Sequence, residues 1–199
     1  MPSFEDVRSI LRQYPFELTE DIEEKFYLYL KELIRWNEVH NLTGFKDWRR
    51  ILKEHFLGSL LVDRCLRKME VNIGGFEVSD VGSGAGFPGA VLKIFYKNSI
   101  NMTLIEPSWK RCAFLEHLDT KLNIGFKVIC KRAEEVDLTF DLVMSRAIDG
   151  GISKLEVLKN LSRKYLIYMI GENQAKEIDC CEVSLKDLKA YMLFIAKTR

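Results

Sequence analysis

The stretch "FEVSDVGSGAGFPG" at residues 76–89 places four glycines within eight positions, directly after a short apolar run. Glycine gives up more backbone entropy on folding than other residues, so such density is favoured only where side chains must be excluded. A strand that leads through a glycine-rich turn into a helix lets a nucleotide-type ligand approach the backbone N–H groups. The stretch therefore predicts a ligand site at the end of the first strand of an α/β sheet.

The rest of the chain fits such a sheet. Beyond residue 72, short β-type runs alternate with helix-type segments, which is typical of a parallel sheet with right-handed crossovers. We therefore expect a doubly wound α/β domain over residues 73–199, with a helical extension over residues 1–72 packed against it. A last strand, which could run antiparallel, is expected in "YMLFIAKT". The β-type runs lie at residues 76–81, 101–106, 126–131, 140–145 and 165–170.

The part before residue 72 predicts three helices. Ser3 can cap the first helix, with Asp6 at the capping-box position, and the second helix follows Thr19. The third begins near Asp47 and runs through "WRRILKEHFLGSLL", with a break expected at Gly58. Apolar residues at three- and four-residue steps mark one side of the second helix, namely Ile22, Phe26, Leu30 and Leu33.

The net charge and the length of the apolar runs limit the kinds of partner that the chain can bind. Lys and Arg number 30 against 29 Asp and Glu, so the formal net charge is +1 and any basic surface must be local. The longest purely apolar run, "YLIYMI", is too short to span a bilayer, and the start "MPSFEDVRSI" shows no signal-peptide core. We therefore expect no membrane partner.

The five cysteines include no C-x-x-C pair and no zinc spacing. This usage predicts reduced thiols in a cytoplasmic protein and no metal site. The cysteines are Cys65, Cys112, Cys130, Cys180 and Cys181.

The glycines alone leave the ligand open. Gly82-x-Gly84-x-Gly86 fits the loop, and so does Gly84-x-Gly86-x-x-Gly89, which resembles a dinucleotide fingerprint. Asp80 lies two residues before Gly82, at the end of the strand. A carboxylate beneath the loop suits the ammonium group of an amino-acid-like ligand and is poorly suited to pyrophosphate.

A second acidic residue, Glu106, distinguishes further between the possible ligands of the glycine loop. Glu106 closes the second predicted strand, where a carboxylate can accept both ribose hydroxyls of an adenosine. An ammonium-binding and a ribose-binding carboxylate together predict S-adenosylmethionine as the cofactor. NAD and a tight turn without a ligand are the alternatives.

Two later segments reach the same edge of the predicted sheet. After the third strand, the backbone of Ala133 and the side chain of Glu134 could frame adenine, although a solvated charged turn is the alternative. Ser145 and Arg146 end the fourth strand, the edge where such folds place substrate chemistry. A surface arginine or a structural ion pair is the alternative for Arg146.

With these residues assembled, the chain resembles the bacterial 16S ribosomal RNA guanine-N7 methyltransferase G family, also called glucose-inhibited division protein B. The resemblance implies a class I S-adenosylmethionine-dependent methyltransferase fold with an N-terminal helical cap. It also implies methyl transfer to N7 of one guanine in small-subunit RNA. It rests on "LIRWNEVHNLTG", "EHFLGSL", "DVGSGAGFPG", "LIEPSWKRCAFL", "RAEE" and "FDLVMSRA", and runs from about residue 22 to about 171.

The resemblance also implies roles for single residues. Arg132 and Arg146 are the expected catalytic residues, and Lys110, Arg111 and Arg132 match basic positions that the family turns toward RNA or substrate. The partner would be 16S ribosomal RNA, the small subunit or its assembly intermediate, acted on by a monomer. Matching positions carry the family's donor-binding roles to Gly82, Phe87, Ala133, Glu134 and Arg146, beside the Asp80, Gly84, Gly86 and Glu106 singled out above.

Further residues have two interpretations each. Arg49 and Arg50 belong to a basic run between residues 46 and 68, which is either a phosphate-binding face or ordinary helix surface. Trp109, beside Lys110 and Arg111, could cover adenine, touch RNA or pack.

Four side chains near the predicted site are also ambiguous. Phe87 could stack on the target base or fill the loop as an apolar plug. Asn37 and Asn41 could hydrogen-bond the loop beside the cofactor or help to end the helix. His55 is expected to be packed or capping.

Two positions depart from the family pattern, and two other functions stay open. Gly58 stands where relatives usually carry an acid, and Met169 to Gly171 stand where they carry lysine and glycine. The same fold acting on a small molecule or a protein is one alternative. A non-catalytic module that binds RNA or a ligand is the other.

Overall fold

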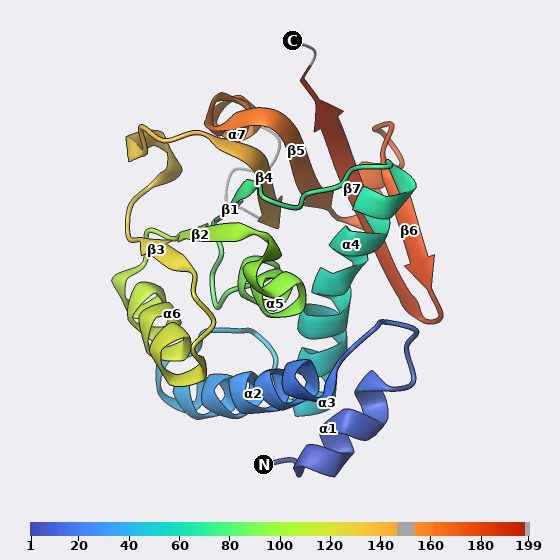
Figure 1. Ribbon diagram of the computed structural model, residues 1–199, viewed down its shortest axis with the longest axis vertical. Coiled ribbons are helices and arrows are strands. Elements are labelled where there is room, and N and C mark those ends of the chain that lie inside the picture. Colours follow the sequence, from blue (N-terminus) through green and yellow to red (C-terminus); the bar gives the residue numbers. More distant parts are fainter. Residues whose placement is uncertain (147–153, 198–199) are drawn as a thin grey trace.

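The computed structural model describes residues 1–146 and 154–197. Its centre is a seven-stranded sheet in the order β3-β2-β1-β4-β5-β7-β6 (Figure 1). The first five strands in this order are parallel, β7 runs antiparallel to β5, and β6 runs antiparallel to β7. The chain runs outward from β1 to β3 and then returns to β4, so the strand order reverses between β1 and β4. The strands are β1 (Glu77–Val81), β2 (Asn101–Ile105), β3 (Lys127–Ile129), β4 (Phe140–Arg146), β5 (Ser162–Ile170), β6 (Cys181–Leu185) and β7 (Leu188–Ala196).

The predicted doubly wound α/β fold is confirmed, including the antiparallel last strand. Helices lie on both faces of the sheet, and α2 and α3 lie below α5 in Figure 1. The helices are α1 (Phe4–Leu11), α2 (Glu20–His40), α3 (Trp48–Ile51), α4 (Gly58–Lys68), α5 (Gly89–Tyr96), α6 (Trp109–Leu122), α7 (Leu155–Leu161) and α8 (Glu172–Ala175). Shorter helical segments are the π-helix η1 (Leu52–Leu57) and the 3₁₀ segments η2 (Lys97–Ser99) and η3 (Ala133–Glu135).

The first helix begins as the sequence predicts. The Ser3 hydroxyl accepts from the Asp6 amide at 3.1 Å, and the Asp6 carboxylate accepts from the Ser3 amide at 3.0 Å. This reciprocal pair satisfies two N–H groups that the helix leaves unbonded. The predicted apolar side of α2 is confirmed as well, since all four of its residues, Ile22, Phe26, Leu30 and Leu33, are buried.

The break expected at Gly58 is wrong. Gly58 has ordinary helical dihedrals (φ −59°, ψ −35°), and the chain continues from α3 through η1 into α4. Glycine in a helix costs about 1 kcal/mol relative to alanine. Burial of Leu57, Leu60 and Leu61 on the same stretch outweighs that cost. What changes at Gly58 is the hydrogen-bond pattern, from π to α.

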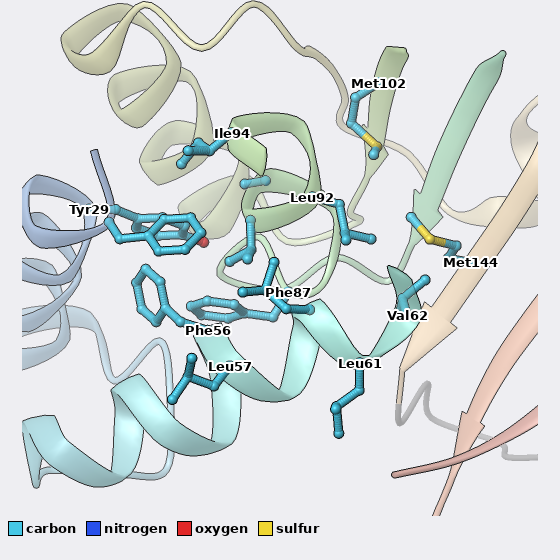
Figure 2. Close-up of a cluster of buried hydrophobic side chains, with 14 of the residues drawn as sticks. Tyr29, Phe56, Leu57, Leu61, Val62, Phe87, Leu92, Ile94, Met102 and Met144 are labelled. Atoms are coloured by element: carbon cyan, nitrogen blue, oxygen red, sulfur yellow. The ribbon is translucent and has the colours of Figure 1, made fainter. Parts of the chain in front are cut away.

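One apolar core joins the helical extension to the sheet. Figure 2 shows Tyr29 and Phe56 of the extension packed with Phe87, while Met102 and Met144 reach the same cluster from β2 and β4. The opposite face of the sheet is covered by α7, with Leu158 and Leu161 in a second cluster. The boundary between residues 1–72 and 73–199 stays a prediction.

The prediction of reduced thiols is wrong for two of the five cysteines. Cys112, in the first turn of α6, forms a disulfide with Cys130, which follows β3. Their Cα atoms lie 5.9 Å apart although 18 residues separate them in the sequence. Adjacent strands β2 and β3 end side by side and bring the two cysteines together, which their sequence spacing does not indicate.

Candidate functional site

The glycine loop is held to the end of the neighbouring strand. The amides of Gly82 and Ser83 donate to the Ile105 carbonyl at 2.8 and 3.2 Å, and the Gly84 amide donates to Glu106 Oε2 at 2.8 Å. The loop therefore lies at the carboxyl ends of β1 and β2, beside the point where the strand order reverses. Ligands of open α/β sheets bind at such points.

Two of the four glycines serve close packing. A Cβ on Gly86, whose φ is +98°, would come within 2.5 Å of the Tyr29 hydroxyl, which donates to the Ala85 carbonyl. A Cβ on Gly89 would lie 2.6 Å from the Cβ of Asp80. Gly86, a predicted cofactor-binding residue, thus lies against α2 and shapes the loop from behind.

Asp80 lies beneath the loop, where the sequence predicts it. The side chain is fully buried, and Oδ2 accepts from the Gly89 amide at 2.7 Å, while Oδ1 has no hydrogen-bond partner among residues 1–146 and 154–197. Burial raises the pKa of this carboxyl to about 7, against the opposing effect of the Gly89 hydrogen bond. One oxygen of Asp80 therefore caps α5, and the other is left for a further partner.

Glu106 is buried at the end of β2 and ties the loop to α6. Its two oxygens accept from the amides of Gly84 and Ser108 at 2.8 and 2.9 Å. Arg111 approaches Oε1 at 3.7 Å. Each carboxylate oxygen has a second lone pair, so Glu106 can still accept hydroxyl groups of a ligand.

A cavity of about 270 Å³ opens beside Glu106 and collects predicted residues from three strand ends. Glu134 pairs with Lys154 across it, and this hydrogen bond lowers the pKa of Glu134. The residues that line it include Gly82, Glu106, Arg111, Arg132, Ala133, Glu134 and Lys154.

A second cavity of about 300 Å³ lies on the other side of the loop. Gly82 and Arg111 line both cavities, so the two adjoin. The helical extension forms one wall through the segment 42–45 and His55. The remaining lining comes from residues 83–85, Phe87 and Arg146.

Phe87 is an apolar plug, because its ring is buried and stacks on two neighbouring rings. Tyr29 stacks on one side with centroids 5.3 Å apart, and His55 stacks with centroids 4.7 Å apart. Phe87 therefore contributes shape to the second cavity, with little of its ring exposed for stacking on a base. His55 Nδ1 is buried, and no residue in the described part of the chain hydrogen-bonds it.

His55 was given no functional role from the sequence, although it lines the second cavity. Burial, aided by the charge of Arg146, lowers the pKa of His55 to about 4, so the ring is neutral at pH 7. Arg146 donates to the Glu54 carbonyl at 3.1 Å, and burial lowers the pKa of its guanidinium. The family motif "SRA" ends at Ala147, which lies outside the described residues.

Asn37 positions the wall of the second cavity. Its amide nitrogen donates to the Phe45 carbonyl at 3.3 Å, and its carbonyl oxygen accepts from the Thr43 amide at 2.8 Å. Asn37 thus hydrogen-bonds the segment that follows α2, and a place of that segment beside the cofactor stays a prediction. Asn41 instead ends α2 in a left-handed conformation.

The four predicted RNA-binding residues are exposed. Arg50 lies over the Phe45 ring at 4.1 Å and Arg49 over the Trp48 ring at 4.4 Å. Lys110 and Arg111 are in the first turn of α6, and Arg111 also lines both cavities.

Neither departure from the family pattern disturbs the loop. A Cβ on Gly58 would make only ordinary contact, 3.7 Å from the Lys53 carbonyl oxygen. Met169 is buried in β5 beside Arg146 of β4, so it extends the apolar core in place of a basic side chain. In the described parts of the chain, no cluster of three or more side chains could hold a metal ion, and no helix is long and apolar enough to span a bilayer.

Similar folds occur among methyltransferases. The chain aligns with the magnesium protoporphyrin IX methyltransferase of Synechocystis PCC 6803, solved with bound SAM, at a TM-score of 0.59 and 11% identity, over 92% of this chain and 100% of that one. A putative RNA methyltransferase from Pyrococcus horikoshii aligns at a TM-score of 0.53 and 17% identity, over 85% of this chain and 99% of that one. The predicted class I, Rossmann-like methyltransferase fold is thereby confirmed.

Sequence relatives identify the family. The ribosomal RNA small subunit methyltransferase G of Aquifex aeolicus (strain VF5) is 42% identical over 94% of this chain and 98% of its own length. The protein of the same name from Aliarcobacter butzleri is 36% identical over 81% of this chain and 84% of its own. A family model described as rRNA small subunit methyltransferase G matches residues 22–198. The chain belongs to this rRNA small subunit methyltransferase G family.

Proposed function

We propose that the protein transfers a methyl group from S-adenosylmethionine to N7 of one guanine in bacterial 16S ribosomal RNA. The observation that carries the proposal is the pair of buried carboxylates, Asp80 and Glu106, on either side of the glycine loop. Buried polar atoms without a partner are rare, so the free Oδ1 of Asp80 points to a ligand group that completes it. Family membership supports the reaction and the RNA substrate.

The residues of the first cavity fit the adenosine part of this cofactor. Glu106 has lone pairs for the ribose hydroxyls, and the backbone of Ala133 with the side chain of Glu134 borders the space for adenine. Asp80 lies beneath the loop and lines neither cavity, and we assign the ammonium group to its unbonded oxygen. When bound, the cofactor supplies a methyl group on a positively charged sulfur.

The second cavity is where we place the acceptor guanine. Guanine N7 has a lone pair and no proton, so the reaction needs no general base. The protein's contribution is alignment, which is worth about 7–11 kcal/mol when the reacting atoms are held in near-attack geometry. Arg146 cannot bind O6 and N7 together, because that contact would block the nucleophile. We therefore assign Arg146 to the cofactor or to a phosphate.

The neutral state of His55 suits this chemistry. An imidazolium in the wall of the second cavity would repel both the sulfonium and the guanine ring, which becomes cationic on methylation. The low pKa of His55, caused by burial and Arg146, avoids this repulsion at pH 7.

Finer features of the partner are part of the same proposal. The substrate is 16S RNA in the small subunit or in an assembly intermediate, and the enzyme acts in the cytoplasm as a monomer. Lys110 and Arg111, Arg49 and Arg50 are the proposed RNA contacts, and Arg132 is proposed to contact cofactor or substrate.

The decisive experiment is transfer of labelled methyl groups to RNA and to small subunits from cells that lack the activity, followed by mapping of the modified nucleotide. We expect one 7-methylguanosine in 16S RNA. Label on a small molecule or a protein alone would favour the first alternative function, and cofactor binding without transfer would favour a non-catalytic module. Thermal stabilisation by NAD and not by S-adenosylhomocysteine would refute the cofactor assignment.

A further inference from the structure

Trp109 is the one large aromatic side chain that the described residues leave mostly in solvent, with 70% of it exposed. The other two tryptophans are partly buried: Trp36 packs against Phe114 and His117, and Trp48 lies under Arg49. The nearest charged group over the Trp109 ring is the Lys110 ammonium, 5.8 Å from the centroid. An indole in this setting has a face available to a partner.

Trp109 also lies at the mouth of the site. It is the first residue of α6, between Pro107, which lines the first cavity, and Arg111, which lines both. The Cys112–Cys130 disulfide ties this first turn of α6 to the end of β3. The indole therefore has a fixed attachment two residues from Arg111, which lines both cavities.

Basic side chains lie around Trp109 and the two cavities, although the whole chain is nearly neutral. Lys110 and Arg111 adjoin Trp109, and Arg132 lines the first cavity. Across the second cavity, Arg50 covers the ring of Phe45, which lines that cavity. Aromatic rings interleaved with cations are the usual means of binding single-stranded nucleic acid.

We propose that Trp109 is a stacking platform for the nucleotide next to the target guanine, with Lys110 and Arg111 binding the adjoining phosphates. A guanine that enters the second cavity must leave the stack of bases, so the neighbouring base loses its stacking partner. The indole of Trp109 would stack on that base in place of the guanine. This inference rests on the proposed function, and it adds that the enzyme reads the target in a single-stranded segment.

The test separates RNA binding from cofactor binding. In Trp109→Ala we expect KM for the RNA substrate to rise about 5- to 150-fold, the range for loss of one base–aromatic stack, with kcat at saturation largely kept. Trp109→Phe, which retains a ring, should recover most of the loss. Affinity for S-adenosylhomocysteine and the melting temperature should match wild type, as they should in the control Met69→Ala, an exposed apolar residue at the far end of α4.

Each contrary outcome overturns the proposal. An unchanged KM in Trp109→Ala would show that the indole does not contact RNA, and weakened S-adenosylhomocysteine binding would show that it covers adenine instead. Fluorescence anisotropy with a labelled single strand of about 12 nucleotides, and with its duplex, keeps the test independent of catalysis. Equal binding of the single strand by wild type and Trp109→Ala would refute the platform even if no methyl transfer were found, whereas absent transfer with a clear binding difference would refute only the proposed reaction.

Discussion

If Asp80 binds the ammonium group of the cofactor, then cofactor affinity must follow the ionisation of Asp80. Its carboxyl has a pKa of about 7 in the ligand-free protein, because it is fully buried. An ammonium group attracts the carboxylate form and gains little from the neutral acid. Roughly a tenth of the molecules are ionised at pH 6 and nine-tenths at pH 8, so affinity for S-adenosylhomocysteine should rise about ninefold between these values.

Calorimetry can measure both the affinity for S-adenosylhomocysteine and the number of protons that Asp80 releases when this ligand binds. At pH 6, binding should release close to one proton per ligand, seen as a dependence of the heat on the ionisation enthalpy of the buffer. Asp80→Asn keeps an oxygen for the Gly89 amide and removes the charge, so it should bind weakly at pH 8 and show a flat profile. His55, with a pKa of about 4, titrates below this window.

The same shift makes a prediction for the protein without ligand. The folded-state pKa of Asp80 lies above its ordinary 3.8, so between about pH 4 and pH 7 the folded protein keeps a proton that the unfolded chain releases. Stability therefore falls as the pH rises through this window, by at most about 4 kcal/mol from this group. Asp80→Asn should lessen that fall. Wild-type affinity that is flat from pH 6 to 8, with no proton released, would refute the assigned contact.

The remaining predictions concern the loop, the disulfide and His55. Gly86→Ala should lower the free energy of unfolding by about 2–5 kcal/mol in urea titrations, because the added Cβ would meet the Tyr29 hydroxyl and the residue has a left-handed φ. Gly84→Ala, whose Cβ would have open space around it, should lower it by only about 1–2 kcal/mol. Equal losses in the two variants would contradict the steric argument. Reduction of Cys112–Cys130, verified by mass spectrometry of alkylated peptides, should cost about 3 kcal/mol for a loop of this length, and Cys112→Ser should then no longer respond to reductant. His55→Phe keeps a ring against Phe87 but removes Nδ1, so we expect kcat/KM for RNA to fall about 2- to 12-fold with little change in stability, and an unchanged rate would leave His55 as packing only.

Features that depend on near neighbours in the chain could be predicted from the sequence. The sequence predicts the capping box at Ser3 from two residues three positions apart, and it predicts the buried side of α2 and the parallel strands from short periodic patterns. The structure has all three features. The sequence does not indicate the strand β6, because it is a short edge strand that only its pairing with β7 defines. The sequence predicts the helix around Gly58 but not its continuity at that residue, because the burial that outweighs the cost of glycine comes from the sheet and from α5.

Some residues of the candidate site could likewise be predicted from the sequence, and others could not. The positions of Asp80, Glu106 and Arg146 could be inferred because parallel strands end at one edge, so strand ends far apart in sequence become neighbours. The sequence predicts that the extension packs against the sheet, but nothing in it indicates that His55 and the segment 42–45 form a cavity wall there. The disulfide between Cys112 and Cys130 is another consequence of that shared edge, which the sequence spacing of the cysteines does not indicate.

The contact between α2 and the loop explains why the extension accompanies this sheet. Gly86 can take its left-handed conformation against α2 only because it lacks a side chain, and the Tyr29 hydroxyl satisfies the adjacent Ala85 carbonyl. Asn37, two turns further along α2, holds the segment that walls the second cavity. One helix therefore fixes both the loop that would hold the cofactor and the wall that would face the acceptor base. Any shift of α2 must move the two binding surfaces together, which makes α2 the element on which their alignment depends.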